Sequence, residues 1–314
     1  MRVLFPEGKN ACFSGAVEAI DYLHSFNTKT ILIEPEKIFV RNEDKALYLV
    51  IFDGSTYEYL IRRSFLEKLF KWYSFPIRQL EYFDIDTITA MCNDYIINIK
   101  AKYVNIKIED GDALTITSEK FSDVNDIELI QNLDTQGIER IFIDDYTTSI
   151  RIEEKFRMKP FRGDEFGMGM LISNSETGFS AVKIKDYLLR YVCSNGAYIH
   201  ETNSTAKFYH YNLFVQSVFD KVNAMLEDIE VRGGKIEARI RKMEEPISSE
   251  SILQINKNIT RATAIKLLND VIDTDRTLSR YELFNLITER AKAFDQTRRM
   301  IIEGIAGNLV ETVN

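Results

Sequence analysis

The sequence predicts an α+β fold, with antiparallel, β-rich N-terminal and central regions followed by a helical C-terminal region. Short runs of β-branched and aromatic residues, separated by turn sequences, predict strands up to about residue 211. From residue 212 the apolar residues recur at spacings of three and four, which is the period of an α-helix. Two hairpin signals with glycine-containing turns indicate that neighbouring strands pair antiparallel.

The chain divides by pattern and by charge near residue 150. Residues 1–150 form an acidic α+β region with 16 Lys+Arg against 25 Asp+Glu, and residues 151–314 hold 24 against 23. This second part contains a β-hairpin unit at 151–211 and a helical region at 212–314. A chain of 314 residues is long enough for one large domain or two modest ones.

The first half alternates strands with helices. A helix is predicted at 63–73, because Phe65 and Leu69 share one helical face. Asp84 is placed to cap a second helix. The strands predicted before these helices are 28–35, 37–42, 45–53 and 55–63. The remaining elements of this half are a hairpin at 103–118, a short helix near 123–133 and a second hairpin at 139–152.

The centre of the chain is a longer hairpin, with strands predicted at 166–174 and 179–194. Gly178, in the SETG segment between them, suits the positive φ that such a turn needs. A long helical stretch follows, and Gly233-Gly234 is expected to break or kink it. Further helices are predicted at about 259–271, 278–293 and 295–312.

The sequence disfavours several classes of protein. It has no run of 18 apolar residues and no apolar segment near the N-terminus, so we expect a cytoplasmic protein without a membrane partner. The three scattered cysteines, Cys12, Cys92 and Cys193, suit a reducing compartment. Because it contains no phosphate-loop or zinc motif, we expect no cofactor, no metal and no enzymatic activity.

One catalytic alternative stays open around Cys193. A cysteine nucleophile needs a base, and His200 lies seven residues further along the chain. No known protease or transferase signature surrounds Cys193, so packing at the end of a strand is the preferred interpretation. The candidates for a carboxylate-bound Mg²⁺ are the acidic pairs Asp144-Asp145 and Asp273/Asp275, although acidic turn residues are far commoner than metal sites.

Basic and aromatic residues alternate along the segment 179–194. Its even-numbered positions are largely apolar, whereas its odd-numbered positions combine lysines with aromatic rings. The neighbouring segments KFRMKPFR (155–162) and KFYHY (207–211) are also basic and aromatic. Such a surface is typical of single-stranded nucleic-acid binding, since rings stack on bases and ammonium groups meet phosphates. A half-solvated strand carries the same alternation, and that interpretation also stands.

We therefore predict a single-stranded DNA contact surface. Its residues are Lys155, Arg157, Lys159, Arg162, Lys183, Lys185, Tyr187 and Tyr191. Phosphate neutralisation and base stacking suffice for binding, so no covalent chemistry is needed, and salt is expected to weaken the affinity steeply.

Two stretches of the sequence resemble a known family. The signature G-D, strand, N-S-x-x-G, strand, R-x-V-C-S-N-G is matched by Gly163, Asp164, Asn174, Ser175, Gly178, Arg190, Val192, Cys193, Ser194, Asn195 and Gly196. The C-terminal stretch is matched by Tyr281, Asn285, Thr288, Glu289 and Gly307. On these residues the chain, over about 150–310, resembles the phage- and plasmid-encoded family called domain of unknown function nine-hundred-and-thirty-two. The first 150 residues match that family only loosely.

The resemblance implies a phage, prophage or mobile-element setting, and it supplies no reaction. A strand-rich centre followed by helices is also similar, at the level of architecture, to the ring-forming single-strand annealing proteins of phage recombination. The leading hypothesis is a homo-oligomeric DNA-metabolism protein that binds single-stranded DNA and promotes annealing. The alternative is a phage-encoded protein-interaction factor, an inhibitor or DNA mimic whose acidic half acts on a host enzyme without nucleic-acid binding.

Overall fold

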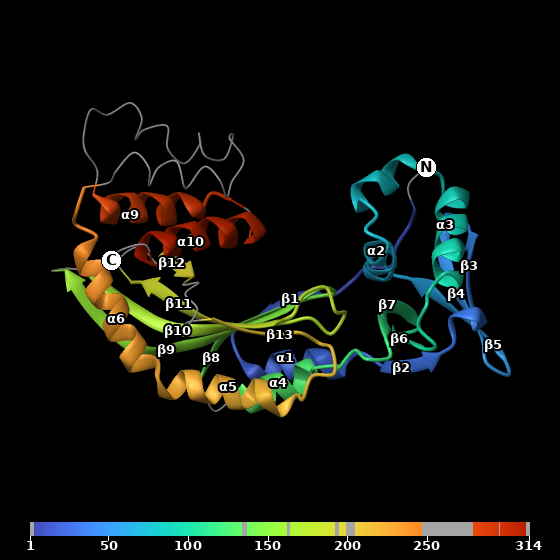
Figure 1. The fold of residues 1–314 in the computed structure, drawn as a ribbon, viewed down its shortest axis with the longest axis horizontal. Coiled ribbons are helices and arrows are strands. Elements are labelled where there is room, and N and C mark those ends of the chain that lie inside the picture. The colour runs from blue at the N-terminus through green and yellow to red at the C-terminus, as the bar shows by residue number, and fades with distance from the viewer. Residues whose placement is uncertain are drawn as a thin grey trace. The chain divides into compact units, whose positions relative to one another are not determined.

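The fold is α+β, as the sequence predicts. A computed structural model describes residues 3–133, 137–161, 164–191, 195–198, 205–246, 279–294 and 296–311. The chain forms two compact units (Figure 1). The first unit comprises Met1–Ile150, Ser173–Val182 and Phe208–Gln216, and the second comprises Arg151–Ile172, Lys183–Lys207 and Ser217–Asn314. The first unit thus contains the predicted acidic region together with two later segments that the sequence did not assign to it.

A six-stranded sheet forms the centre of the first unit. In chain order its strands are β2 (Thr28–Ile33), β3 (Ile38–Glu43), β4 (Ala46–Phe52), β5 (Thr56–Ile61), β6 (Val104–Glu109) and β7 (Asp112–Ser118). Their order across the sheet is β2-β6-β7-β5-β4-β3, and the β5–β7 pair is parallel while the others are antiparallel. The four predicted strands between residues 28 and 63 and the hairpin at 103–118 are all present.

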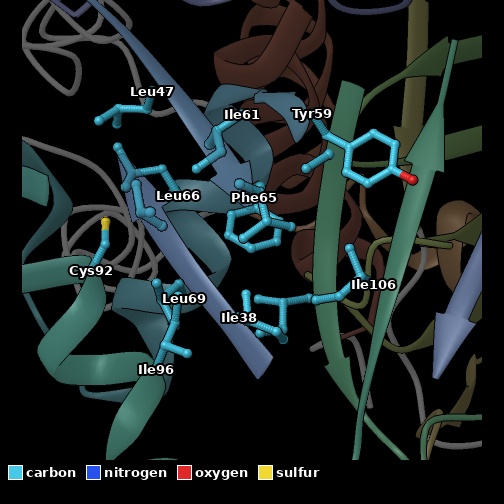
Figure 2. Packing of buried hydrophobic residues seen from close by; sticks show 14 of the residues in the cluster. Ile38, Leu47, Tyr59, Ile61, Phe65, Leu66, Leu69, Cys92, Ile96 and Ile106 are labelled. Atoms are coloured by element: carbon cyan, nitrogen blue, oxygen red, sulfur yellow. The ribbon is translucent and has the colours of Figure 1, made fainter. Parts of the chain in front are cut away.

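Two helices pack on this sheet, α2 (Arg63–Trp72) and α3 (Ile85–Ile97). Phe65 and Leu69 of α2 are fully buried and face the apolar side chains of the strands, as Figure 2 shows. Asp84 caps α3 as predicted, because its side chain accepts a hydrogen bond of 2.7 Å from the Thr87 amide. Trp72, at the end of α2, packs half-buried against the same core.

Several shorter elements complete the first unit. These are the 3₁₀ turns η1 (Pro35–Lys37) and η2 (Ile77–Tyr82) and the helices α1 (Ala16–His24) and α4 (Asp126–Leu133). The sequence did not predict α1, which packs against α4.

A seven-stranded sheet contains the remaining strands. They are β1 (Asn10–Phe13), β8 (Ile138–Asp144), β9 (Thr148–Phe161), β10 (Asp164–Asn174), β11 (Val182–Arg190), β12 (Asn195–Tyr198) and β13 (Thr205–Phe208). Their order is β1-β8-β9-β10-β11-β12, and β13 also pairs with β11. The predicted central hairpin is β10 and β11, and Gly178 between them has a φ of +70°, as the turn requires.

Helices dominate the C-terminal part of the chain. Those within the described residues are α5 (Gln216–Glu227), α6 (Ile229–Lys242), α9 (Arg280–Ala291) and α10 (Gln296–Glu311). Helices α9 and α10 lie side by side, and α10 packs on β12 (Figure 1). In the part of the chain that the structure describes, no helix is long and apolar enough to cross a membrane. The helix predicted at 259–271 falls outside the described residues.

The sequence predicts a break or a kink at Gly233-Gly234, and a break does not occur there. Helix α6 continues through both glycines, and the helical stretch is interrupted at Asp228 instead. Gly233 serves close packing, because a Cβ atom at this position would lie 2.2 Å from the Phe156 ring of β9. No atom lies within 4 Å of the equivalent position at Gly234.

Candidate nucleic-acid interface

Strand β9 of the second unit presents a row of basic side chains to solvent. Its residues alternate, so that Met158 is buried while Arg157 and Lys159 have side chains that are 67% and 72% exposed. Lys155, two positions earlier, is also exposed. Side chains at every second position of a strand share one face. The three basic residues predicted at 155, 157 and 159 therefore lie on a single accessible face, which we call the odd face of β9.

Strand β11 separates an apolar face from a polar one, as its sequence predicts. Val182, Ile184 and Leu188 are at most 1% exposed and belong to the core. Lys183 and Lys185 alternate with them and are half-buried. The two predicted lysines are thus on the more accessible face of this strand.

Tyr187 does not fit its predicted role as a stacking platform. Its side chain is 1% exposed, and the guanidinium of Arg151 lies 4.2 Å from the ring centroid. A cation over the ring face is a favourable contact. Because Arg151 and the surrounding core cover the ring, no nucleotide base can stack on it in this structure.

Two contacts place β9 and β11 side chains on the same face of the sheet. Arg151 of β9 lies over Tyr187 of β11, and Arg157 of β9 lies 5.0 Å from the ring centroid of Tyr191, just after β11. Strand β10 runs between the two strands. The basic residues of β9 and β11 therefore form one surface across three strands, with the half-buried Tyr191 within it.

Among the side chains that the structure describes on this surface, one is acidic. The Glu165 carboxylate of β10 is 3.7 Å from the Arg157 guanidinium and 3.4 Å from the Lys159 ammonium. All three side chains are partly or largely exposed, so solvent screens these pairs strongly. Glu165 reduces the positive charge of the surface without cancelling it. Arg162, the fourth basic residue predicted in this segment, lies outside the described residues.

The opposite face of the strands is anchored by α6. Arg232 forms hydrogen bonds of 2.7 and 2.8 Å with both carboxylate oxygens of Asp186, and both side chains are buried. Burial raises the pKa of Asp186, and Arg232 opposes that shift. A bidentate pair of this kind fixes orientation as well as distance. Asp186 interrupts the otherwise apolar even-numbered positions of β11, and its partner lies 46 residues away in the sequence.

The N-S-x-x-G part of the family-like signature occupies structural positions rather than the basic surface. The Asn174 amide donates to the Val124 carbonyl and to Asp126, both at 2.6–2.7 Å. The Gly178 carbonyl accepts a hydrogen bond from the Lys68 ammonium. These residues lie in the first unit and hold the β10–β11 turn against its core, so the N-S-x-x-G segment has a clear structural role there.

The two matched stretches of the resemblance meet in the second unit. The Tyr281 hydroxyl at the start of α9 donates a hydrogen bond to the Asp164 carboxylate at the start of β10. The Tyr281 ring also lies against Phe161, with centroids 4.6 Å apart. Residues 117 positions apart in sequence are thereby joined.

The first unit also contains a buried network of charged side chains that the sequence did not predict. Lys107 bonds Asp123 at 2.9 Å and Glu176 at 2.6 Å, and Glu176 accepts from the Asp126 amide at 2.6 Å. Burial would lower the pKa of Lys107, but the Glu176 and Asp123 carboxylates outweigh it and raise the pKa. Asp126 accepts from Thr148, and its burial raises its pKa to about 7. Every charge in this network has an internal partner, which indicates a structural role.

The described residues do not bring together the side chains of the catalytic or metal-binding alternatives. Cys193, His200 and the pair Asp273/Asp275 lie outside them. Asp144 accepts from the backbone amides of the turn that follows it, and Asp145 pairs with Arg62 at 3.1 Å. Within the described ranges, no group of three or more His, Cys, Asp or Glu side chains is arranged to hold a metal ion.

Comparison of the chain with protein-family models, with curated proteins and with solved structures finds no match. The resemblance in the central and C-terminal stretches therefore stays a prediction. The candidate interface stands on its own geometry.

Proposed function

We propose that the second unit binds single-stranded DNA along the odd face of β9 and the adjoining face of β11. The observation that carries this proposal is the exposed row of Lys155, Arg157 and Lys159 on one face of a strand. An extended strand repeats such side chains every 6–7 Å or so. A row of this kind follows a polynucleotide backbone, whose phosphates it neutralises.

The proposed binding mode is mainly electrostatic. Tyr187 is covered, so aromatic stacking on this face is left to the half-buried Tyr191, over whose ring the Arg157 guanidinium lies at 5.0 Å from the centroid. Lys183 and Lys185 add charge from β11. Contacts to phosphate carry no sequence information, so the proposal is binding of single strands without sequence preference.

The wider setting is part of the same proposal. A homo-oligomer that holds single strands by their phosphates leaves the bases free to pair, which is what annealing requires. This role suits the phage or mobile-element DNA metabolism that the family resemblance implies, in the cytoplasm of a host. Mixing two complementary labelled strands with the protein tests annealing, and the mass in solution tests self-association.

The decisive experiment is a fluorescence-anisotropy titration of the full-length protein into a labelled single-stranded oligonucleotide. We expect the affinity to fall steeply between low and moderate salt, by about 0.7 log units per log unit of salt for each phosphate neutralised. Unlabelled duplex is expected to compete less well than unlabelled single strand. Absence of binding at micromolar protein in low salt would refute the proposal.

The protein-interaction alternative keeps one observation in its favour. Among the described residues of the first unit, the buried charged side chains include Lys9, Arg62, Lys68 and Lys107 but fewer acidic ones, Glu109 and Asp126. The net charge of the accessible side chains of this unit is therefore more negative than the net charge of all its residues. If the full-length protein inhibits a DNA-cleaving enzyme competitively with DNA while failing to bind DNA itself, this alternative replaces the first.

A further inference from the structure

Three large aromatic side chains of the first unit are exposed within six residues of each other. Tyr209, Tyr211 and Phe214 are 65%, 60% and 73% exposed. The Lys120 ammonium lies 5.6 Å from the centroid of the Tyr211 ring. We call these four residues the aromatic patch. Single exposed apolar residues are ordinary on protein surfaces, but a cluster of them is typical of an interaction site.

The backbone holds this segment in a fixed position. The Ser122 amide donates to the His210 carbonyl at 2.7 Å, and the Asn212 amide donates to the Lys120 carbonyl at 2.9 Å. The His210 side chain between the two tyrosines is buried, and its Nδ1 atom lies 2.9 Å from the Ser122 carbonyl oxygen. The rings are thus presented from a paired backbone, so little ordering is needed when a ligand binds.

The chemistry of the patch suits flat, uncharged ring systems. Lys120 contributes one positive charge, and the exposed Glu119 beside it contributes one negative charge. The patch residues taken together with Glu119 therefore carry no net charge. Its rings offer what a nucleotide base binds, because every base has a π-face that stacks on tyrosine or phenylalanine.

We propose that the aromatic patch is a base-stacking site for unpaired nucleotides of single-stranded DNA. This inference rests on the proposed function and adds a second, chemically distinct site to it. The basic surface of the second unit neutralises phosphates, whereas the aromatic patch of the first unit binds bases. The two sites can be separated by probe chemistry, because an abasic strand keeps its phosphates and lacks its bases.

The test uses two labelled probes of equal length, oligothymidylate and the abasic deoxyribose-phosphate chain. The full-length variants are Tyr209→Ala, Tyr211→Ala and Phe214→Ala, singly and combined. Tyr82→Ala is the matched control, since Tyr82 is 85% exposed in the same unit and lies outside the patch. Circular dichroism verifies that each variant is folded.

We expect each stacking ring that is removed to weaken oligothymidylate binding by about 5- to 150-fold. Binding of the abasic chain and the salt dependence of binding are expected to stay as in the wild type. Tyr209→Phe and Tyr211→Phe keep the rings and are expected to keep the affinity. The Tyr82→Ala control should bind both probes normally.

The possible failures are distinct. If the wild-type protein does not bind oligothymidylate, the proposed function fails and this inference with it. If the wild type binds in a salt-dependent manner and the triple variant binds equally well, only the base-stacking inference is overturned. It is also overturned if the triple variant loses affinity for both probes equally, since its effect is then not specific to bases. A lower mass of the triple variant in solution overturns it as well, because the patch is then a contact between copies of the chain.

Discussion

Basic side chains play opposite roles in the buried network of the first unit and on the odd face of β9 in the second unit. In the first unit Lys107 is 6% exposed and lies between two carboxylates, and Arg62 is buried among Glu109, Asp112 and Asp145. In the second unit the basic residues of the odd face of β9 remain largely in solvent. The first arrangement contributes to the specific packing of a core, and the second leaves charge available to a ligand. Burial beside carboxylates, and not the number of lysines, separates the two roles.

The largest expected effect comes from removing a buried cation of the first unit. Lys107→Met leaves the Asp123 and Glu176 carboxylates without their partner, and breaking a buried ion pair costs about 3–5 kcal/mol of unfolding free energy. Urea denaturation of the full-length protein measures this loss. The exposed Lys100→Met is the control and should stay within about 0.5 kcal/mol of the wild type. A loss below about 1 kcal/mol for Lys107→Met would remove the contrast between the units.

The next effect concerns binding and not stability. In the triple variant Lys155→Gln, Arg157→Gln and Lys159→Gln, we expect the slope of log affinity against log salt to become shallower by up to about 2, since each lost phosphate contact contributes about 0.7. The affinity at low salt should fall by about 10- to 100-fold, and the unfolding free energy should change little.

A charge-matched triple variant controls for net charge. Lys29→Gln, Lys100→Gln and Lys102→Gln remove three exposed positive charges from the first unit. If this variant loses as much affinity as the β9 variant, binding depends on overall charge and the proposed surface is wrong.

A third prediction separates two adjacent glycines of α6. Gly233→Ala forces a methyl group against Phe156 and should cost about 1–3 kcal/mol, because the neighbouring side chain has to move. Gly234→Ala meets no atom within 4 Å and should gain about 0.5–1 kcal/mol through helix propensity. Thermal unfolding measures both. Equal effects at the two positions would contradict the packing of the apolar face of β9 on α6.

The last prediction concerns a pH dependence of the first unit. The pKa of Asp126 is raised from 3.8 to about 7, so between these values the folded state holds a proton that the unfolded state has released. Its contribution to stability is therefore present at low pH and is lost as the pH rises through about 7. Asp126→Asn should remove this contribution.

Subtracting the stability of Asp126→Asn from that of the wild type at each pH separates the contribution of Asp126 from those of its neighbours. His210, whose pKa is lowered by burial, acts in the opposite direction and is present in both. Glu176, whose pKa is lowered, acts only below its ordinary value of 4.5. Denaturant midpoints of wild type and Asp126→Asn between pH 5 and 8 provide the measurement. Parallel curves for the two proteins would show that Asp126 is ionised throughout.

The local elements of this fold follow from the sequence, because their causes are local. The Asp84 cap, the positive φ of Gly178 and the buried face of β11 each depend on residues within a few positions. The exposed row on β9 was predictable for the same reason, because the alternation of a strand can be recognised in the sequence. Its residues are Lys155, Arg157 and Lys159.

The predictions from the sequence fail where the environment of a residue is set by a partner that is distant in the sequence. Tyr187 looked accessible in the strand pattern, but Arg151, from another strand, covers it. Gly233 looked like a helix breaker, but the constraint is Phe156, which lies 77 positions earlier. The partners of Lys107 stand 16 and 69 residues away, so no window of sequence contains the network.

The position of Trp72 has a practical consequence. It is the single tryptophan of the chain, and it lies half-buried against the core of the first unit. Indole emission excited apart from tyrosine therefore comes from one unit alone. Melting of that unit can be followed optically without any added label, while the second unit stays silent at the same wavelength.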